Sequence, residues 1–90
     1  MNEIVVITNT GCQPCDTLKD FLLSLSCPTL ISFLDDDNSN KEDRDNIIAS
    51  YGIFKYPLIV FRSDEADTVS TVVDEDTFSF IRKFLNCPSI

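Results

Sequence analysis

The chain has 90 residues, of which 43% are hydrophobic, and this length and composition suit one small folded domain and exclude an intrinsically disordered chain. Fifteen acidic and seven basic residues give a net charge of −8, which argues against nucleic acid as a partner. The chain has no histidine, so Cys/His zinc sites and histidine-activated nucleophiles are excluded too.

The distribution of hydrophobic residues indicates the expected cellular compartment of the protein. The apolar runs are far shorter than the roughly 20 residues that span a bilayer, so no membrane partner is expected. Met1-Asn2-Glu3 leads directly into an apolar run without a basic segment, so no secretory signal is expected either. We therefore expect a cytoplasmic protein, in which a C-x-x-C motif is more often catalytic or metal-binding than a permanent crosslink.

The first half of the chain predicts strand, helix, strand, helix. The β-branched run 4–8 is typical of a central strand buried on both faces, and 29–34 predicts the second strand. The first helix should follow Pro14 and end at Cys27-Pro28, because a residue before proline avoids the α region. Its apolar face recurs at helical spacing at Leu18, Phe21, Leu22 and Leu25. The second helix is expected over 41–52, with Gly52 as its stop and an apolar side formed by Ile47, Ile48 and Tyr51.

The second half predicts two more strands and a last helix. The strands are expected at 57–61, led by a proline, and at 68–73. Asp74 is a plausible N-cap for the helix, whose apolar positions are Phe78, Ile81, Phe84 and Leu85. The resulting order is βαβαββα, and without repeats or linkers we expect residues 1–90 to form a single domain.

Acidic residues cluster at Asp35-Asp36-Asp37 and continue through Glu42, Asp43 and Asp45. A magnesium or calcium site would use such carboxylates, but the segment lacks the glycine and distal glutamate of an EF-hand loop. We expect a solvated loop and helix face, with no metal and no cofactor.

The motif Cys12-Gln13-Pro14-Cys15 lies where a strand and a glycine turn open a helix. Free N–H groups at a helix N-terminus stabilise negative charge, so the Cys12 thiolate should be favoured and Cys12 should be the nucleophile. Cys15, one turn later, would resolve the mixed disulfide, and Pro14 would stiffen the turn. Two alternatives remain: a zinc site, although four-thiolate sites usually need a second C-x-x-C, and an inert buried pair.

Together with this motif, a second segment carries a family resemblance. Tyr51-Gly52-Ile53-Phe54-Lys55-Tyr56-Pro57-Leu58-Ile59-Val60-Phe61 is similar to the thioredoxin pattern Y-G-I-x-x-x-P-T-L-x-x-F, and CQPC is similar to C-G-P-C. With its order of elements, the chain resembles the thioredoxin–glutaredoxin family over nearly its whole length. The resemblance implies an α/β thioredoxin-like fold, a four-stranded mixed sheet flanked by three helices.

The resemblance also implies a substrate site. Pro57 would be cis and lie against the dithiol, the alternative being an ordinary trans proline at a strand start. The Tyr56 backbone would pair with an extended substrate segment, and Gly11, Gln13 and Pro14 would complete the binding surface.

The sequence departs from both branches of this family. Thioredoxins have an aromatic residue at the position of Gly11 and a buried aspartate at that of Val6. Glutaredoxins bind glutathione with a lysine where Asn9 stands and a Gly-Gly-x-Asp segment where Val73-Asp74-Glu75-Asp76 stands. We therefore favour protein disulfides as substrates and a flavoprotein disulfide reductase as the electron donor. The alternatives are a glutathione-dependent glutaredoxin and a non-enzymatic binding or metal-carrying module.

The resemblance suggests a monomer, and small proteins of this kind include hydrogen donors for ribonucleotide reductase, although no residue selects that client. The remaining cysteines, Cys27 and Cys87, each precede a proline at a helix end. In the family both helices lie on one face of the sheet, so these two cysteines are expected near one another. They are either small buried hydrophobes or a second disulfide.

Overall fold

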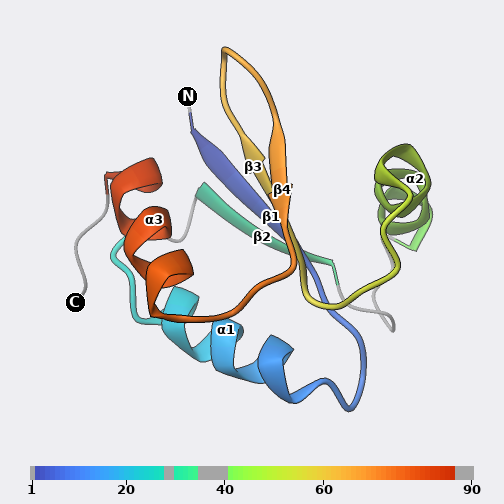
Figure 1. Cartoon of the computed structure of the whole chain (residues 1–90), viewed down its shortest axis with the longest axis horizontal. Coiled ribbons are helices and arrows are strands. Elements are labelled where there is room, and N and C mark those ends of the chain that lie inside the picture. Colours follow the sequence, from blue (N-terminus) through green and yellow to red (C-terminus); the bar gives the residue numbers. More distant parts are fainter. Residues whose placement is uncertain (1, 28–29, 35–40, 87–90) are drawn as a thin grey trace.

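The computed structural model describes residues 2–27, 30–34 and 41–86 (Figure 1). The elements are β1 (Glu3–Ile7), α1 (Gln13–Leu23), β2 (Ile31–Leu34), α2 (Lys41–Tyr51), β3 (Leu58–Arg62), β4 (Thr68–Ser70) and α3 (Glu75–Leu85). The predicted order βαβαββα is confirmed. Within these residues, no helix is long and apolar enough to cross a membrane.

The strands form one mixed sheet in the order β2-β1-β3-β4. Strand β1 runs parallel to β2 and antiparallel to β3, and β3 pairs antiparallel with β4. The interior position of β1 explains its β-branched sequence, because both of its faces are covered: Ile4, Val6 and Ile7 have no exposed surface. The mixed four-stranded sheet implied by the resemblance is thus confirmed.

The helices divide between the two faces of the sheet. In Figure 1, α1 and α3 lie together on one side and α2 lies on the other. The face under α1 and α3, hereafter the two-helix face, has a core of Ile4, Val6, Leu18, Leu22, Leu25, Ile59, Phe61, Ile81 and Leu85. The face under α2, hereafter the one-helix face, has a smaller core of Val5, Ile7, Leu34, Ile48, Leu58 and Val60. Alternate residues of β1 and β3 point to opposite faces, so each strand supplies both cores.

Aromatic rings join the two helices of the larger core. The rings of Phe21 in α1 and Phe78 in α3 stack with centroids 4.2 Å apart. Phe61 of β3 meets Phe84 of α3 edge to face at 5.3 Å. These pairs fix the position of α1, which carries the cysteine motif, against α3 and the sheet.

The first helix ends earlier than the sequence predicted. It stops at Leu23 rather than at Cys27-Pro28, because the N–H and the hydroxyl of Ser24 both donate to the Phe21 carbonyl. This i→i−3 contact tightens the last turn and ends the α pattern. Leu25 still reaches the core, with 2% of its surface exposed, so the predicted apolar face holds beyond the helix itself.

The last strand is shorter than the predicted 68–73. Pairing ends where Ser70 meets Ile59, and the Ser70 hydroxyl then accepts a hydrogen bond from the Val72 N–H. Continuing the ladder would bring β4 opposite Pro57, which has no N–H to donate. The other three strands lie close to their predicted bounds. Strand β1 begins and ends one residue earlier than the predicted 4–8, and β3 begins and ends one residue later than the predicted 57–61. Strand β2 ends at Leu34 as predicted but begins at Ile31 rather than at residue 29.

Two other predicted helix ends are confirmed, whereas α3 ends at Leu85, with Asn86 as its left-handed C-cap, before the predicted stop at Cys87-Pro88. Asp74 is the N-cap of α3, and its Oδ1 accepts a hydrogen bond of 2.8 Å from the Thr77 N–H. Gly52 follows α2 with a φ of +65°, a conformation that glycine adopts without a steric penalty. Glu42, Asp43 and Asp45 are exposed on α2, as expected for a solvated helix face, while Asp35-Asp36-Asp37 lie outside the described residues.

Candidate active site

The turn between β1 and α1 places the cysteine motif just beyond the C-terminal end of β1. Thr8 extends the pairing of β1, since its N–H donates to the Leu34 carbonyl at 3.1 Å. The chain then turns through Gly11, which has a φ of +78° and open space around its α-carbon. The Cys12 N–H closes the turn on the Asn9 carbonyl at 3.3 Å. Glycine is favoured at this position for its backbone conformation alone, because a side chain would meet no atom nearby.

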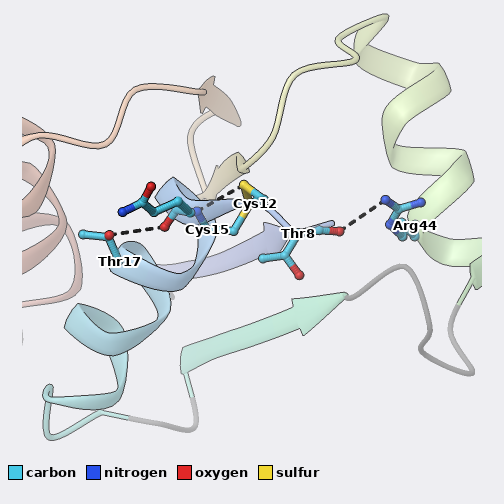
Figure 2. Close-up of a disulfide and its surroundings, with 6 residues drawn as sticks. Thr8, Cys12, Cys15, Thr17 and Arg44 are labelled. Carbon is cyan, nitrogen blue, oxygen red and sulfur yellow. Dashed lines mark hydrogen bonds between the residues drawn. A yellow bond between two sulfur atoms is a disulfide. The ribbon is translucent and has the colours of Figure 1, made fainter. Parts of the chain in front are cut away.

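Cys12 is the N-cap of α1, so the prediction that a helix opens at the motif is confirmed. Its backbone is extended, with φ −93° and ψ 104°, and its Sγ accepts a hydrogen bond of 3.2 Å from the Cys15 N–H (Figure 2). Pro14 occupies the first turn, where an N–H would have no helical partner. The Cys12 sulfur therefore occupies the position at a helix N-terminus where negative charge is stabilised.

The two cysteines of the motif form a disulfide. Their Sγ atoms are 2.10 Å apart and their α-carbons 5.2 Å apart. Cys15 is buried, with 2% of its surface exposed, whereas Cys12 is half-buried. Cys12 is thus the sulfur that a large partner reaches first, and Cys15 is shielded behind it.

The Tyr56-Pro57 segment lies at the same end of the sheet, just before the start of β3. The peptide bond between these residues is cis, as the resemblance implied, and Pro57 is fully buried. Leu58, the next residue, pairs with Ile7 at the end of β1, so Pro57 lies beside Thr8, where the cysteine turn begins. Antiparallel pairing of β1 and β3 therefore brings together two segments far apart in the sequence.

The surface beside the disulfide is hollowed and partly apolar. A hollow of about 270 Å³ is lined by Gln13, Pro14, Thr17 and Val73, so the loop before α3 faces the start of α1. Gly11, Gln13 and Pro14 are exposed there, and Tyr56 is half-buried against the one-helix core. Val72, the residue before Val73, has 54% of its surface exposed. Sequence reasoning had not selected Val73, although an apolar residue just before a helix cap could have suggested it.

Sequence reasoning also missed Arg44. Only 8% of its surface is exposed, and one of its terminal guanidinium nitrogens donates a hydrogen bond of 3.2 Å to the Thr8 carbonyl (Figure 2). Its Cζ lies 5.2 Å from the centre of the Tyr56 ring. The signal in the sequence was its spacing, since Arg44 precedes the core residue Ile48 by four positions on the helix.

The second cysteine pair is not resolved by these findings. Cys27 is half-buried, packs against the larger core and is disulfide-bonded, so it is not a free thiol. Cys87 lies outside the described residues, so the pairing of Cys27 with Cys87 stays a prediction. In the part of the chain that the structure describes, no three Cys, Asp or Glu side chains converge as a metal site would require. The predicted placement of α1 and α3 on one face of the sheet is confirmed.

Comparisons with solved structures identify the fold. Thioredoxin O2 from Arabidopsis thaliana, in its oxidised state, superimposes with a TM-score of 0.67 at 17% identity, over 92% of this chain and 73% of that one. The germline-specific thioredoxin Deadhead from Drosophila melanogaster gives 0.58 at 17% identity, over 90% and 79%. A thioredoxin from Malassezia sympodialis gives 0.61 at 15% identity, over 91% and 72%.

These likenesses are structural rather than sequential. No family model matches the chain, and no curated protein sequence matches it as a relative. The chain therefore has the thioredoxin fold, and its disulfide lies at the start of the first helix.

Proposed function

We propose that this chain is a thiol–disulfide oxidoreductase that reduces disulfides in proteins. The observation that carries the proposal is the Cys12–Cys15 disulfide at the N-terminus of α1, beside the cis Tyr56-Pro57 segment on a thioredoxin fold. A reversible disulfide at a helix N-terminus suits electron transfer, because the same N–H groups that face the sulfur stabilise its thiolate once the bond is reduced.

The reaction consists of two exchanges. The Cys12 thiolate attacks one sulfur of the substrate disulfide, a mixed disulfide forms, and the other substrate sulfur leaves as a thiolate. The Cys15 thiolate then attacks the Cys12 sulfur, which releases the second substrate thiolate and forms the Cys12–Cys15 bond. Two electrons pass from the dithiol to the substrate, the proton of Cys15 goes to solvent, and solvent protonates the leaving thiolates. An external dithiol, such as that of a flavoprotein disulfide reductase, restores the reduced form.

The charge beside the site favours a protein over glutathione as the substrate. Val73 lines the hollow next to the disulfide, and Asp74, Glu75 and Asp76 follow it at the start of α3. The Asp74 carboxylate caps the helix, since its Oδ1 accepts a hydrogen bond from the Thr77 N–H. The carboxylates of glutathione would approach this acidic segment unfavourably, whereas Tyr56 and the exposed Gln13 and Pro14 could border an extended protein segment.

The first test replaces single cysteines. With dithiothreitol as the electron source, the parent should reduce insulin, and Cys12→Ser should fall to the uncatalysed rate because the nucleophile is lost. Cys15→Ser should accumulate a mixed disulfide with its substrate, visible by mass spectrometry. The double variant Cys27→Ser/Cys87→Ser is the control outside the site, because it removes the other two cysteines without leaving an unpaired thiol, and it should keep the parental rate. Full activity of Cys12→Ser would show that another group reacts.

The second test identifies the electron donor and the direction. Turnover with NADPH and a flavoprotein thioredoxin reductase would support the proposal, and turnover only with glutathione, glutathione reductase and NADPH would replace it with the glutaredoxin alternative. A potential of the Cys12–Cys15 couple near or below the cytosolic poise, roughly −220 to −320 mV, fits a cytoplasmic reductase. A value well above that range would make the protein an oxidant.

A further inference from the structure

Within the described ranges, Arg44 is the only charged side chain that is buried. Burial of a charge is unfavourable unless a close opposite charge compensates for it. Among the described residues, Arg44 makes a weak ion pair with Asp45, since 3.9 Å separates the two charged groups and 55% of the Asp45 side chain is exposed to water. The Arg44 Nε is buried with no hydrogen-bond partner among the residues that the structure describes, which adds a further penalty.

The contacts of Arg44 instead join the two segments of the proposed active site. The hydrogen bond to the Thr8 carbonyl holds the residue from which the chain turns toward Cys12. The guanidinium also lies over the ring of Tyr56, the residue before Pro57. Figure 2 shows Arg44 reaching from α2 toward Thr8, with Cys12 on the far side of Thr8. One side chain thus contacts both the cysteine turn and the segment proposed to pair with substrate.

We propose that Arg44 is a positioning residue that fixes Tyr56 relative to the turn that carries Cys12. The inference rests on the proposed function, because Tyr56 matters only if its backbone aligns a substrate segment. A substrate paired with Tyr56 presents its disulfide to Cys12 only when the two segments keep a constant separation. An apolar residue would fill the same space without the penalties of burial, but it could not hold both segments.

The two substitutions of Arg44 separate charge from volume. Arg44→Met keeps an unbranched apolar stem and loses both the donor and the cation. Arg44→Lys keeps a cation that can donate to Thr8 or lie over Tyr56, but it lacks the planar fork that does both. Arg82→Met is the matched control, because the Arg82 guanidinium also lies over a ring, that of Phe21 at 4.9 Å, but it is exposed near the far end of α3.

The experiment compares two substrates. Insulin offers a backbone that can pair with Tyr56, whereas dipyridyl disulfide has no backbone and needs only the Cys12 sulfur. In Arg44→Met, KM for insulin should rise about tenfold, the usual consequence of losing a charged hydrogen bond, while kcat/KM for dipyridyl disulfide stays at the parental value. Arg44→Lys should have a KM for insulin between those of the parent and Arg44→Met. Arg82→Met should match the parent on both substrates.

Other outcomes overturn the inference. Equal losses on both substrates, following the unfolded fraction measured by circular dichroism, would mean that Arg44 only supports the fold. Parental kinetics in Arg44→Met would mean that it positions nothing.

A readout without catalysis separates this inference from the proposed function. The N–H groups of Thr8 and Cys12 are both hydrogen-bonded, and their hydrogen exchange should accelerate about fivefold in Arg44→Met and not in Arg82→Met. If the parent reduces neither substrate, the proposed function fails, and the exchange rates alone decide whether Arg44 holds the turn. Unchanged exchange would then reject the inference as well.

Discussion

The two faces of the sheet are stabilised in different ways. On the two-helix face, α1 and α3 contribute four fully apolar core positions, Leu18, Leu22, Ile81 and Leu85, and paired aromatic rings join the helices. On the one-helix face, α2 buries only Ile48 and the charged Arg44. The first arrangement gives the helix of the cysteine motif a tightly packed support, while the second ties a helix to the cysteine turn by a polar contact.

The two faces of the sheet therefore contribute differently: one keeps α1 in place by apolar packing, and the other holds the cysteine turn by a directional contact. The apolar core needs no specific partners and keeps α1 in place. The polar contact of α2 is directional, so it can fix the relative position of Thr8 and Tyr56 in a way that apolar packing does not.

The largest effect is expected when one isoleucine on each face of the sheet is replaced by alanine. Ile81 has no exposed surface and Ile48 has 7% exposed, so the same change can be made at matched positions. Ile81→Ala should lower the free energy of unfolding by about 4 kcal/mol and Ile48→Ala by about 2 kcal/mol, because a more enclosed cavity collapses less. Urea denaturation measures both, and equal losses would mean that the two cores are equally well packed.

A smaller effect is expected at the start of α3. Asp74→Ala removes the cap of the Thr77 N–H and should lower the free energy of unfolding by about 1 kcal/mol. Asp76→Ala is the control, since Asp76 is an exposed acid in the first turn of the same helix and should change stability by less than about half as much. A larger loss in Asp76→Ala would show that charge at this end matters more than the cap.

The smallest effect should be a gain at the end of α3. Asn86 has a left-handed conformation with φ 52° and ψ 48°, the conformation that Gly52 supplies after α2. Asn86→Gly should raise the free energy of unfolding by about 0.5 kcal/mol, because glycine adopts positive φ without steric cost. A lower melting midpoint in thermal denaturation would mean that the greater freedom of the unfolded glycine chain outweighs this relief.

The chemistry-bearing part of the site was largely predictable. The cysteines and their place at a helix start follow from local patterns of a few residues, whereas the cis Pro57 was implied only by the family resemblance. Element ends were less predictable, because the Ser24 contacts that end α1 compete locally with a helical pattern that continues to Leu25. The length of β4 depends on where its pairing with β3 stops, and residues 68–73 alone do not indicate this position.

Arg44 shows why the remainder of the site could not be predicted. An arginine on an acidic, mostly exposed helix is typical of a solvated face, and nothing near it in the sequence indicates Thr8 or Tyr56. Its burial follows from the packing of α2 against the sheet and from the register that places Pro57 beside Thr8.

Sequence alone determined the order of elements, the apolar faces of the helices and the position of the cysteine pair at a helix start, because hydrophobic periodicity and capping act over a few neighbouring residues. Only the tertiary structure decided which distant residues meet. The pairing of β1 with β3 brought Tyr56-Pro57 to the cysteine turn, and packing of α2 brought Arg44 into contact with both Thr8 and Tyr56. Those contacts depend on strand register and helix packing, which are properties of the whole folded chain.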